Sequence, residues 1–151
     1  MLSVLKDFQA DIVIMHNLGI PANKAVTISE DKDVIEEIVN WAGDKIADLE
    51  KQGIQKERLI FDPGVGFGKT PQQCLEILKR IEEFKALGLR IMVGHSRKSF
   101  LNQFTSKDFK ERDIETLGAS TFLASKRIHY LRVHDVELHT RAFKVLGAIN
   151  R

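Results

Sequence analysis

The sequence has 151 residues, the size of one domain, of which 43% are hydrophobic and 29% are charged. Its formal charge of +2 is too balanced to indicate a protein that binds nucleic acid or an anionic membrane. There is no signal-peptide pattern and no apolar run of the roughly 18 residues that a spanning helix needs, and the single cysteine, Cys74, favours a reducing, cytoplasmic setting.

Four short, nearly continuous apolar runs are typical of strands that are covered on both faces of a parallel sheet. These runs are "DIVIMH" (11–16), "RLIFD" (58–62), "RIMVG" (90–94) and "YLRVHD" (130–135). An amphipathic stretch follows each run, so the chain is predicted to be α/β with four βα units and parallel strands. Periodicity leaves open whether they form a small open sheet or half of an eight-stranded barrel.

The predicted helix after the second strand has the clearest start. Thr70 is suited to cap it, Pro71 to begin it, and Gln73 to complete a capping box. Gly53 is expected to end the first helix, and Gly88 the second. The apolar sides of the four helices run over 35–49, 74–84, 113–128 and 138–149, and residues 102–112 are expected to be a surface loop.

The stretch "LIFDPGVGFGKT" (59–70) looks like a phosphate-binding loop, but its spacing is wrong. A P-loop needs a glycine where Pro63 stands, and a dinucleotide fingerprint needs one where Lys69 stands. Asp62 instead ends a strand, placed to accept two hydrogen bonds from a planar amino-heterocycle. The glycines after it would let the backbone fold closely over a flat ligand.

Polar residues cluster where each predicted strand runs into its following loop. "GHSRKS" (94–99) follows the third strand, and "RVHD" (132–135) ends the fourth. In α/β proteins this edge of the sheet carries the active site. Arg132 and His134, two residues apart in an extended strand, should share a face and form an anion site.

Four segments together resemble dihydropteroate synthase: "IVIMHNLGIP", "DPGVGFGK", "GHSRKSF" and "RVHD". They occur in that family's order over essentially all of residues 1–151. The resemblance implies the C-terminal half of a pterin-binding TIM (β/α)8 barrel, namely its fifth to eighth strands, in a transferase that sulfonamides target.

The resemblance also implies a reaction, in which a dihydropterin-methyl diphosphate condenses with para-aminobenzoate to give dihydropteroate and diphosphate. The expected catalytic residues are Lys98, Asp62, Arg132 and His134. The expected contacts are Asp62, Lys98, Met15, Gly94 and Phe67 with the pterin, Ser96, Lys98 and Phe67 with aminobenzoate, and Arg132 and His134 with the diphosphate. Arg97 is expected nearby in a supporting role.

Magnesium is implied by the same resemblance, bound with the diphosphate, and its protein ligand is expected in the family's N-terminal half. A half-barrel has two open sheet edges and an uncovered apolar face. We therefore expect the chain to form a homodimer, to associate with the missing half, or to be part of a longer protein.

Two other functions stay open: a methyltetrahydrofolate-type pterin-binding methyltransferase domain, and a non-catalytic pterin-binding or assembly module. The methyltransferase has no need of a diphosphate clamp, so "SRKS" and "RVHD" favour the synthase. Structural roles are expected for His16, His95, Trp41 and Cys74, and surface or helix positions for His129 and His139.

Overall fold

The computed structural model of the chain describes residues 8, 10–19, 21, 23 and 25–149. Its strands are β1 (Ile12–Met15), β2 (Leu59–Asp62), β3 (Arg90–Val93) and β4 (Tyr130–Leu131), and its α-helices are α2 (Val34–Lys51), α3 (Pro71–Lys79), α4 (Asp113–Ser125) and α5 (Val136–Ile149). Short 3₁₀ turns cover Lys56–Arg58, Ile81–Leu87, Ser99–Gln103 and Phe109–Glu111.

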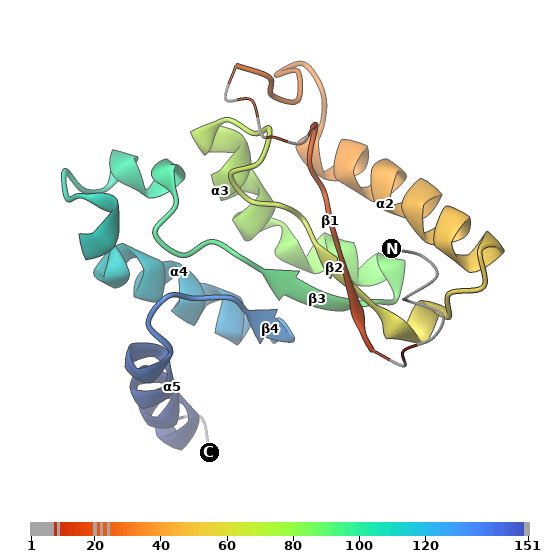
Figure 1. The fold of residues 1–151 in the computed structure, drawn as a ribbon. Helices are drawn as coiled ribbons and strands as arrows, with labels where there is room; N and C mark the ends of the chain where they lie inside the picture. The colour runs from red at the N-terminus through yellow and green to blue at the C-terminus, as the bar shows by residue number, and fades with distance from the viewer. Residues whose placement is uncertain (1–7, 9, 20, 22, 24, 150–151) are drawn as a thin grey trace.

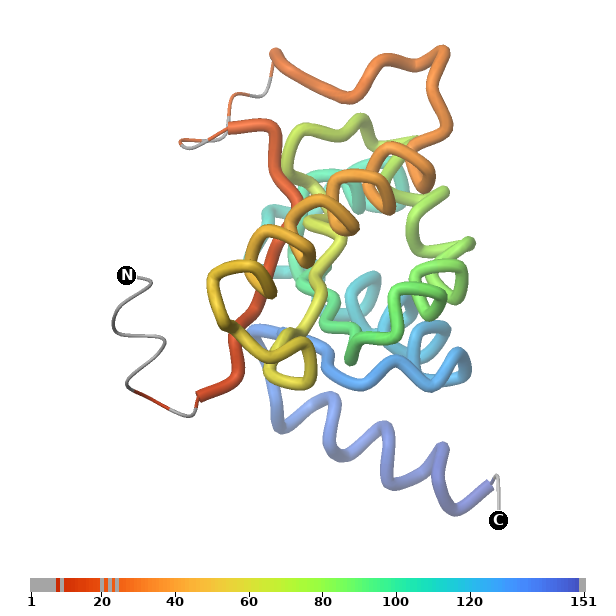
Figure 2. Tube along the Cα trace, turned by 90° about the vertical axis from the view of Figure 1, so that its right-hand side faces the viewer, coloured from red at the N-terminus to blue at the C-terminus, as the bar shows by residue number. Residues whose placement is uncertain are grey.

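The four strands form one parallel sheet in the order β1-β2-β3-β4. Each strand pairs with the next one along the chain, as in an arc of a closed barrel. The helices α3 and α4 lie behind the strands in Figure 1 and to their right in Figure 2, so they cover the same face. The predicted α/β fold with four parallel strands is confirmed.

The core lies between the sheet and these helices, where β2 is buried along its whole length. Phe61 of β2 packs against Phe84 with ring centroids 5.2 Å apart, and both rings are fully buried. Ile38 and Ala42 of α2 and Ile77 of α3 are also fully buried. The apolar stripes of α2 and α3 therefore face the core, as their spacing predicts.

The helix caps expected from the sequence are present, but the C-terminal end of α3 differs from the expectation. Thr70 and Gln73 form the predicted capping box, with hydrogen bonds of 2.9 and 3.2 Å. Gly53 and Gly88 have φ of +84° and +68° and follow the elements that they were expected to end. The prediction that this helix extends to residue 84 is wrong. Helix α3 ends at Lys79, and a 3₁₀ turn continues its apolar side.

Two further expectations need correction. The fourth strand ends at Leu131, so residues 132–135 follow the strand instead of forming its end. The segment 102–112, expected to be a surface loop, contains the end of one 3₁₀ turn and the whole of another.

The last helix leaves much of its apolar side uncovered. In α5, Val136, Val145 and Ile149 are 65%, 61% and 75% exposed. The edge strands are also open, since Val13 of β1 and Tyr130 of β4 are 43% and 39% exposed. Within the described part of the chain, no helix is both long enough and apolar enough to cross a membrane.

Candidate active site

A pocket of about 370 Å³ lies where β2, β3 and β4 run into their following loops. It contains six of the residues singled out from the sequence, contributed by three separate loops. The residues that line it are Phe67, Gly94, Ser96, Lys98, Arg132, Val133 and His134. The fold therefore brings together side chains that lie up to 67 positions apart in the sequence.

Asp62 lies behind this pocket, at the last position of β2, and is 1% exposed. Its Oδ1 accepts a hydrogen bond of 2.8 Å from the Gly64 backbone N–H, and its Oδ2 lies 3.5 Å from Nη2 of Arg132. Burial raises the pKa of this carboxyl group, and the Gly64 N–H and the charges of Lys98 and Arg132 oppose that rise. Asp62 is thus a buried acceptor that faces two cations.

The Lys98 side chain packs against the glycine loop, residues 64–68. Its Nζ donates a hydrogen bond to the carbonyl of Val65 and lies 4.3 Å from the centroid of the Phe67 ring. A Cβ on Gly66, which has φ of +81°, would lie 3.0 Å from Cδ of Lys98. Burial lowers the pKa of Lys98 to about 8, against the opposing effect of Asp62. The glycines therefore let the loop close over this lysine.

Gly94 makes room for Arg132. A Cβ at Gly94 would lie 2.6 Å from Nη2 of Arg132, closer than real Cβ contacts occur. The Arg132 backbone N–H donates to the Val93 carbonyl at 3.0 Å, which holds the residue beside β3 although the strand has ended. The Arg132 side chain remains 57% exposed at the pocket. It is therefore placed to bind an anion that enters from solvent.

Ser96 connects the loop after β3 to the loop after β4. Its Oγ lies 2.9 Å from Nδ1 of His134 and accepts a hydrogen bond of 3.2 Å from the His134 backbone N–H. Ser96 is buried, and the ring of His134 is held by its Nδ1 edge. Arg132 and His134 line the same pocket as predicted, although a loop and not an extended strand places them there.

Arg97 lies between these site residues but is not among those that line the pocket. Its φ is +57°, an uncommon conformation for a residue with a side chain. The Arg97 N–H donates to Oγ1 of Thr116 at 3.0 Å, and its guanidinium forms two bonds of 2.8 and 2.7 Å with Asp113. Helix α4 thus holds the turn from behind, so that Ser96 and Lys98 on either side of Arg97 reach the pocket.

Lys69 is a buried residue of this region that was not among the site residues expected from the sequence. Its Nζ lies 2.8 Å from Nδ1 of His16 and donates to the Phe67 carbonyl at 2.8 Å. Burial lowers the pKa of Lys69 to about 7 and that of His16 to about 4. A lysine directly after the glycines, with a histidine at the end of the neighbouring strand, was the signal that could have identified this pair.

His16 and Gly64 bring β1 against the glycine loop. The His16 ring packs edge-on against Trp41 at 5.1 Å between centroids. A Cβ on Gly64, whose φ is +67°, would lie 1.9 Å from the His16 carbonyl oxygen. Only glycine therefore fits at this crossing of the two backbones.

Met15 is placed beside Asp62 by the register of β1 and β2 and is not among the residues that line the pocket. Asn17, which had no assigned role, donates a hydrogen bond of 3.2 Å to the Met15 carbonyl. Cys74 is buried on α3, as expected. His139, expected at a surface or helix position, lies on α5 with its side chain buried.

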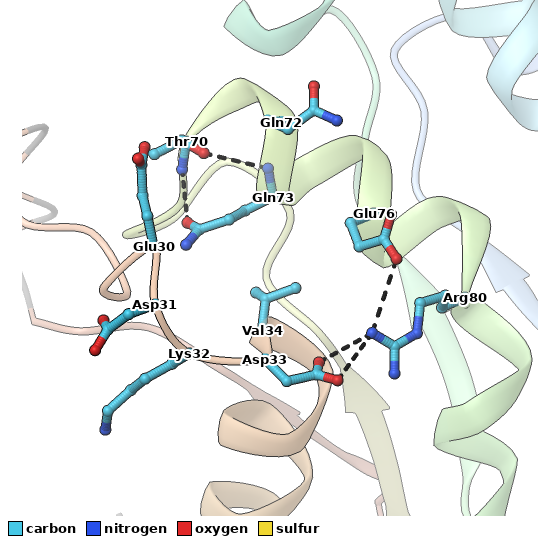
Figure 3. Close-up of a pocket in the computed structure, with 10 residues that line it drawn as sticks. All are labelled: Glu30, Asp31, Lys32, Asp33, Val34, Thr70, Gln72, Gln73, Glu76 and Arg80. Carbon is cyan, nitrogen blue, oxygen red and sulfur yellow. Dashed lines mark hydrogen bonds and ion pairs between the residues drawn. The ribbon is translucent and has the colours of Figure 1, made fainter.

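A larger hollow of about 570 Å³ lies between the start of α2 and α3 (Figure 3). Its polar side chains bond to one another: Arg80 to Asp33 and Glu76, and Thr70 to Gln73. These contacts cap helices and join them. The smaller pocket is the better candidate site, because several cationic and polar groups converge there on open space.

The described residues do not include a group of three or more His, Cys, Asp or Glu side chains that could hold a metal ion. The pocket presents Lys98, Arg132 and His134, which suit an anion, whereas Mg²⁺ requires oxygen ligands. The residues present therefore do not fit a protein-bound magnesium site.

Comparisons with known proteins agree with this geometry. A family model described as "Pterin binding enzyme" matches residues 1–134. Dihydropteroate synthase type-3 of Escherichia coli is 34% identical over 141 residues, which are 91% of this chain and 54% of that protein.

Two solved dihydropteroate synthases share the fold. The enzyme of Anaplasma phagocytophilum with bound 6-hydroxymethylpterin-monophosphate superposes with a TM-score of 0.90 at 37% identity, covering 99% of this chain and 59% of that one. The Xanthomonas albilineans enzyme with 4-aminobenzoic acid gives a TM-score of 0.88 at 29% identity, covering 99% and 52%.

The chain spans between about a sixth and about half of the length of the curated relatives that it matches. Its four parallel strands correspond to about half of the dihydropteroate synthase barrel. The chain belongs to the family of pterin-binding enzymes that includes dihydropteroate synthase.

Proposed function

We propose that this chain is the C-terminal half, residues 1–151, of a dihydropteroate synthase. The enzyme would condense 6-hydroxymethyl-7,8-dihydropterin diphosphate with para-aminobenzoate to give 7,8-dihydropteroate and diphosphate. The observation that carries the proposal is one pocket in which Lys98 meets Arg132 and His134, with the Asp62 carboxylate behind it.

The Asp62 and Lys98 pair suits a pterin. A carboxylate with two oxygens can accept two hydrogen bonds from an aminopyrimidine ring, and Lys98 can donate to a ring carbonyl or nitrogen. Met15 ends the neighbouring strand beside Asp62, the Phe67 ring lies under Lys98, and Gly94 lines the same pocket.

The Arg132 and His134 side chains of the same pocket suit the leaving diphosphate. In the proposed step the bond between the methylene carbon and the diphosphate oxygen breaks, and both electrons leave with the diphosphate. Arg132 and His134 stabilise the charge that develops there, while the electron-rich pterin shares the positive charge on the methylene carbon.

The aminobenzoate would bind next to Ser96, Lys98 and Phe67, which line the same pocket as Arg132 and His134. Its amine then attacks the methylene carbon to form the new C–N bond, and one amine proton is lost to solvent. Since the site needs only to hold the reactants in line, no nucleophilic side chain is required. A solved relative holds 4-aminobenzoic acid, which supports aminobenzoate as the second substrate.

The described residues supply no step for magnesium, and we infer that the metal enters with the diphosphate. The open edges at β1 and β4 and the exposed apolar side of α5 support association with the other half of a barrel or with a second copy. The buried thiol of Cys74 is consistent with a reducing compartment such as the cytoplasm.

The test is dihydropteroate formation with magnesium and both substrates, by the chain alone and with an added N-terminal half of a related synthase. We expect activity on complementation and its loss with Arg132→Ala. A folded chain that binds the pterin but forms no product in either condition would instead be a non-catalytic pterin-binding module.

A further inference from the structure

Three buried polar side chains, separate from the residues that line the pocket, form a continuous hydrogen-bonded chain behind it. His95 Nε2 lies 2.7 Å from the Oγ of Ser120, and that Oγ lies 2.9 Å from Nε2 of His139. Nδ1 of His139 lies 2.6 Å from the carbonyl oxygen of Asp135. The three side chains are at most 4% exposed.

The contact between His139 and the Asp135 carbonyl determines which atom donates and which accepts in each of these hydrogen bonds. A carbonyl oxygen only accepts, so Nδ1 of His139 carries the proton and its Nε2 is the acceptor. Ser120 then donates its hydroxyl proton to His139 and accepts from the Nε2–H of His95. Nδ1 of His95 remains unprotonated, and this buried atom has no hydrogen-bond partner among the described residues.

The two ends of this hydrogen-bonded series adjoin, in the sequence, the two residues whose side chains meet in the pocket. His95 precedes Ser96, and Asp135 follows His134, while Ser96 and His134 bond directly. The loops after β3 and β4 are therefore joined twice, once in the pocket and once through α4 and α5 behind it. Asp135 is itself fixed, because its Oδ1 accepts from the Leu138 N–H at 2.8 Å.

The burial of three polar side chains is costly, and an apolar trio of similar volume would fill the same space. A hydrogen-bonded chain differs from apolar packing because it also fixes the rotation and spacing of the groups that it joins.

We propose that His95, Ser120 and His139 are positioning residues that hold Ser96 and Lys98 at a set distance from Arg132 and His134. This inference rests on the proposed function, because that distance would match the separation between the pterin and its diphosphate. None of the three touches the pocket.

The first experiment compares Ser120→Ala with Ser125→Ala, a serine of the same helix whose exposed hydroxyl bonds only within α4. Imidazole ¹H–¹⁵N spectra of the whole chain should show the Nε2–H tautomer for His95 and the Nδ1–H tautomer for His139. In Ser120→Ala, we expect the Nδ1 resonance of His134 to move and the Kd for inorganic diphosphate to rise about tenfold, the size of one lost hydrogen bond. Ser125→Ala should change neither.

A Ser120→Ala protein that is folded and keeps the wild-type His134 resonance would overturn the proposal. The three buried side chains would then contribute only packing in the core. If the unaltered protein does not bind diphosphate, the diphosphate sub-site assigned to Arg132 and His134 fails, while the His134 resonance still decides the positioning role.

A second pair of variants covers the case in which Ser120→Ala does not fold. His139→Gln keeps an amide that can accept from Ser120, whereas His139→Leu cannot. We expect the His134 resonance of His139→Gln to lie nearer to that of the unaltered protein. Equal displacement in the two variants would count against the proposal.

Discussion

Gly94 and Arg132 are in contact across β3 and the loop after β4, so closely that a Cβ on Gly94 would lie 2.6 Å from the guanidinium Nη2. The sequence predicts Gly94 in the pterin sub-site and Arg132 in the diphosphate sub-site. Their contact means that the glycine also determines where the arginine lies. A single added methyl group is therefore a test of the diphosphate sub-site that leaves every polar group present.

Gly94→Ala should weaken the binding of inorganic diphosphate about tenfold, because the guanidinium must move away from its place beside Asp62. The backbone of Gly94 is not in the left-handed region, so we expect the fold to survive. Isothermal titration calorimetry measures the affinity. Gly118→Ala is the matched control, since its Cβ would meet nothing within 4 Å. Equal affinities for Gly94→Ala and the control would show that Arg132 does not bind the diphosphate.

Asp62→Asn should reduce the affinity for a 6-hydroxymethylpterin by about 10- to 100-fold. The amide keeps the shape of the side chain but replaces one acceptor with a donor, which would face the N–H groups of the pterin. Quenching of pterin fluorescence measures the binding. Asp44→Asn, on the exposed side of α2, should have no effect. Unchanged binding in Asp62→Asn would leave the carboxylate with a structural role, through its bond to the Gly64 N–H and its contact with Arg132.

Lys69 should make stability depend on pH above neutrality. Its pKa in the folded chain is about 7, below the usual 10.5, so the unfolded chain binds more protons between these values. Stability should therefore rise with pH in this window, by about 2 kcal/mol between pH 7 and pH 9 from this one group.

Urea unfolding of Lys69→Met at the two pH values measures this contribution, since the variant should lack it. Lys79→Met is the control, because the Lys79 side chain is 76% exposed. If Lys69→Met and the unaltered protein gain the same stability between pH 7 and pH 9, the lysine is charged in the folded chain throughout, and the contact with His16 has been misjudged.

His16 and His95 should destabilise the fold on mild acidification. Burial lowers both pKa values to about 4, from the usual 6.5, so the unfolded chain takes up protons first as pH falls. The stability is present above pH 6.5 and is lost toward pH 4, by about 2 kcal/mol per histidine at pH 5. Unfolding of His16→Gln and His95→Gln at pH 8 and pH 5 should show a smaller loss in each variant. A loss equal to that of the parent chain would mean that the histidines titrate normally.

Local sequence signals were sufficient for the secondary structure wherever one residue type decides the backbone. Thr70, Pro71 and Gln73 start α3 through contacts within four residues, and Gly53 and Gly88 take the left-handed conformation that other residues avoid. The boundary at Lys79 was missed because apolar periodicity continues into the 3₁₀ turn, and periodicity does not report which hydrogen bonds the backbone forms.

The sequence by itself determined the order of the elements, the edge of the sheet that carries polar residues, and the family resemblance, because these depend on local pattern and chain order. Only the tertiary structure decided which groups meet: Lys69 with His16, Gly94 with Arg132, and His95 with His139 through Ser120. Burial of these groups depends on residues tens of positions away, and so do the shifted pKa values of Lys69, His16 and His95. No local pattern contains that information, since desolvation and hydrogen-bond geometry arise only when distant segments pack together.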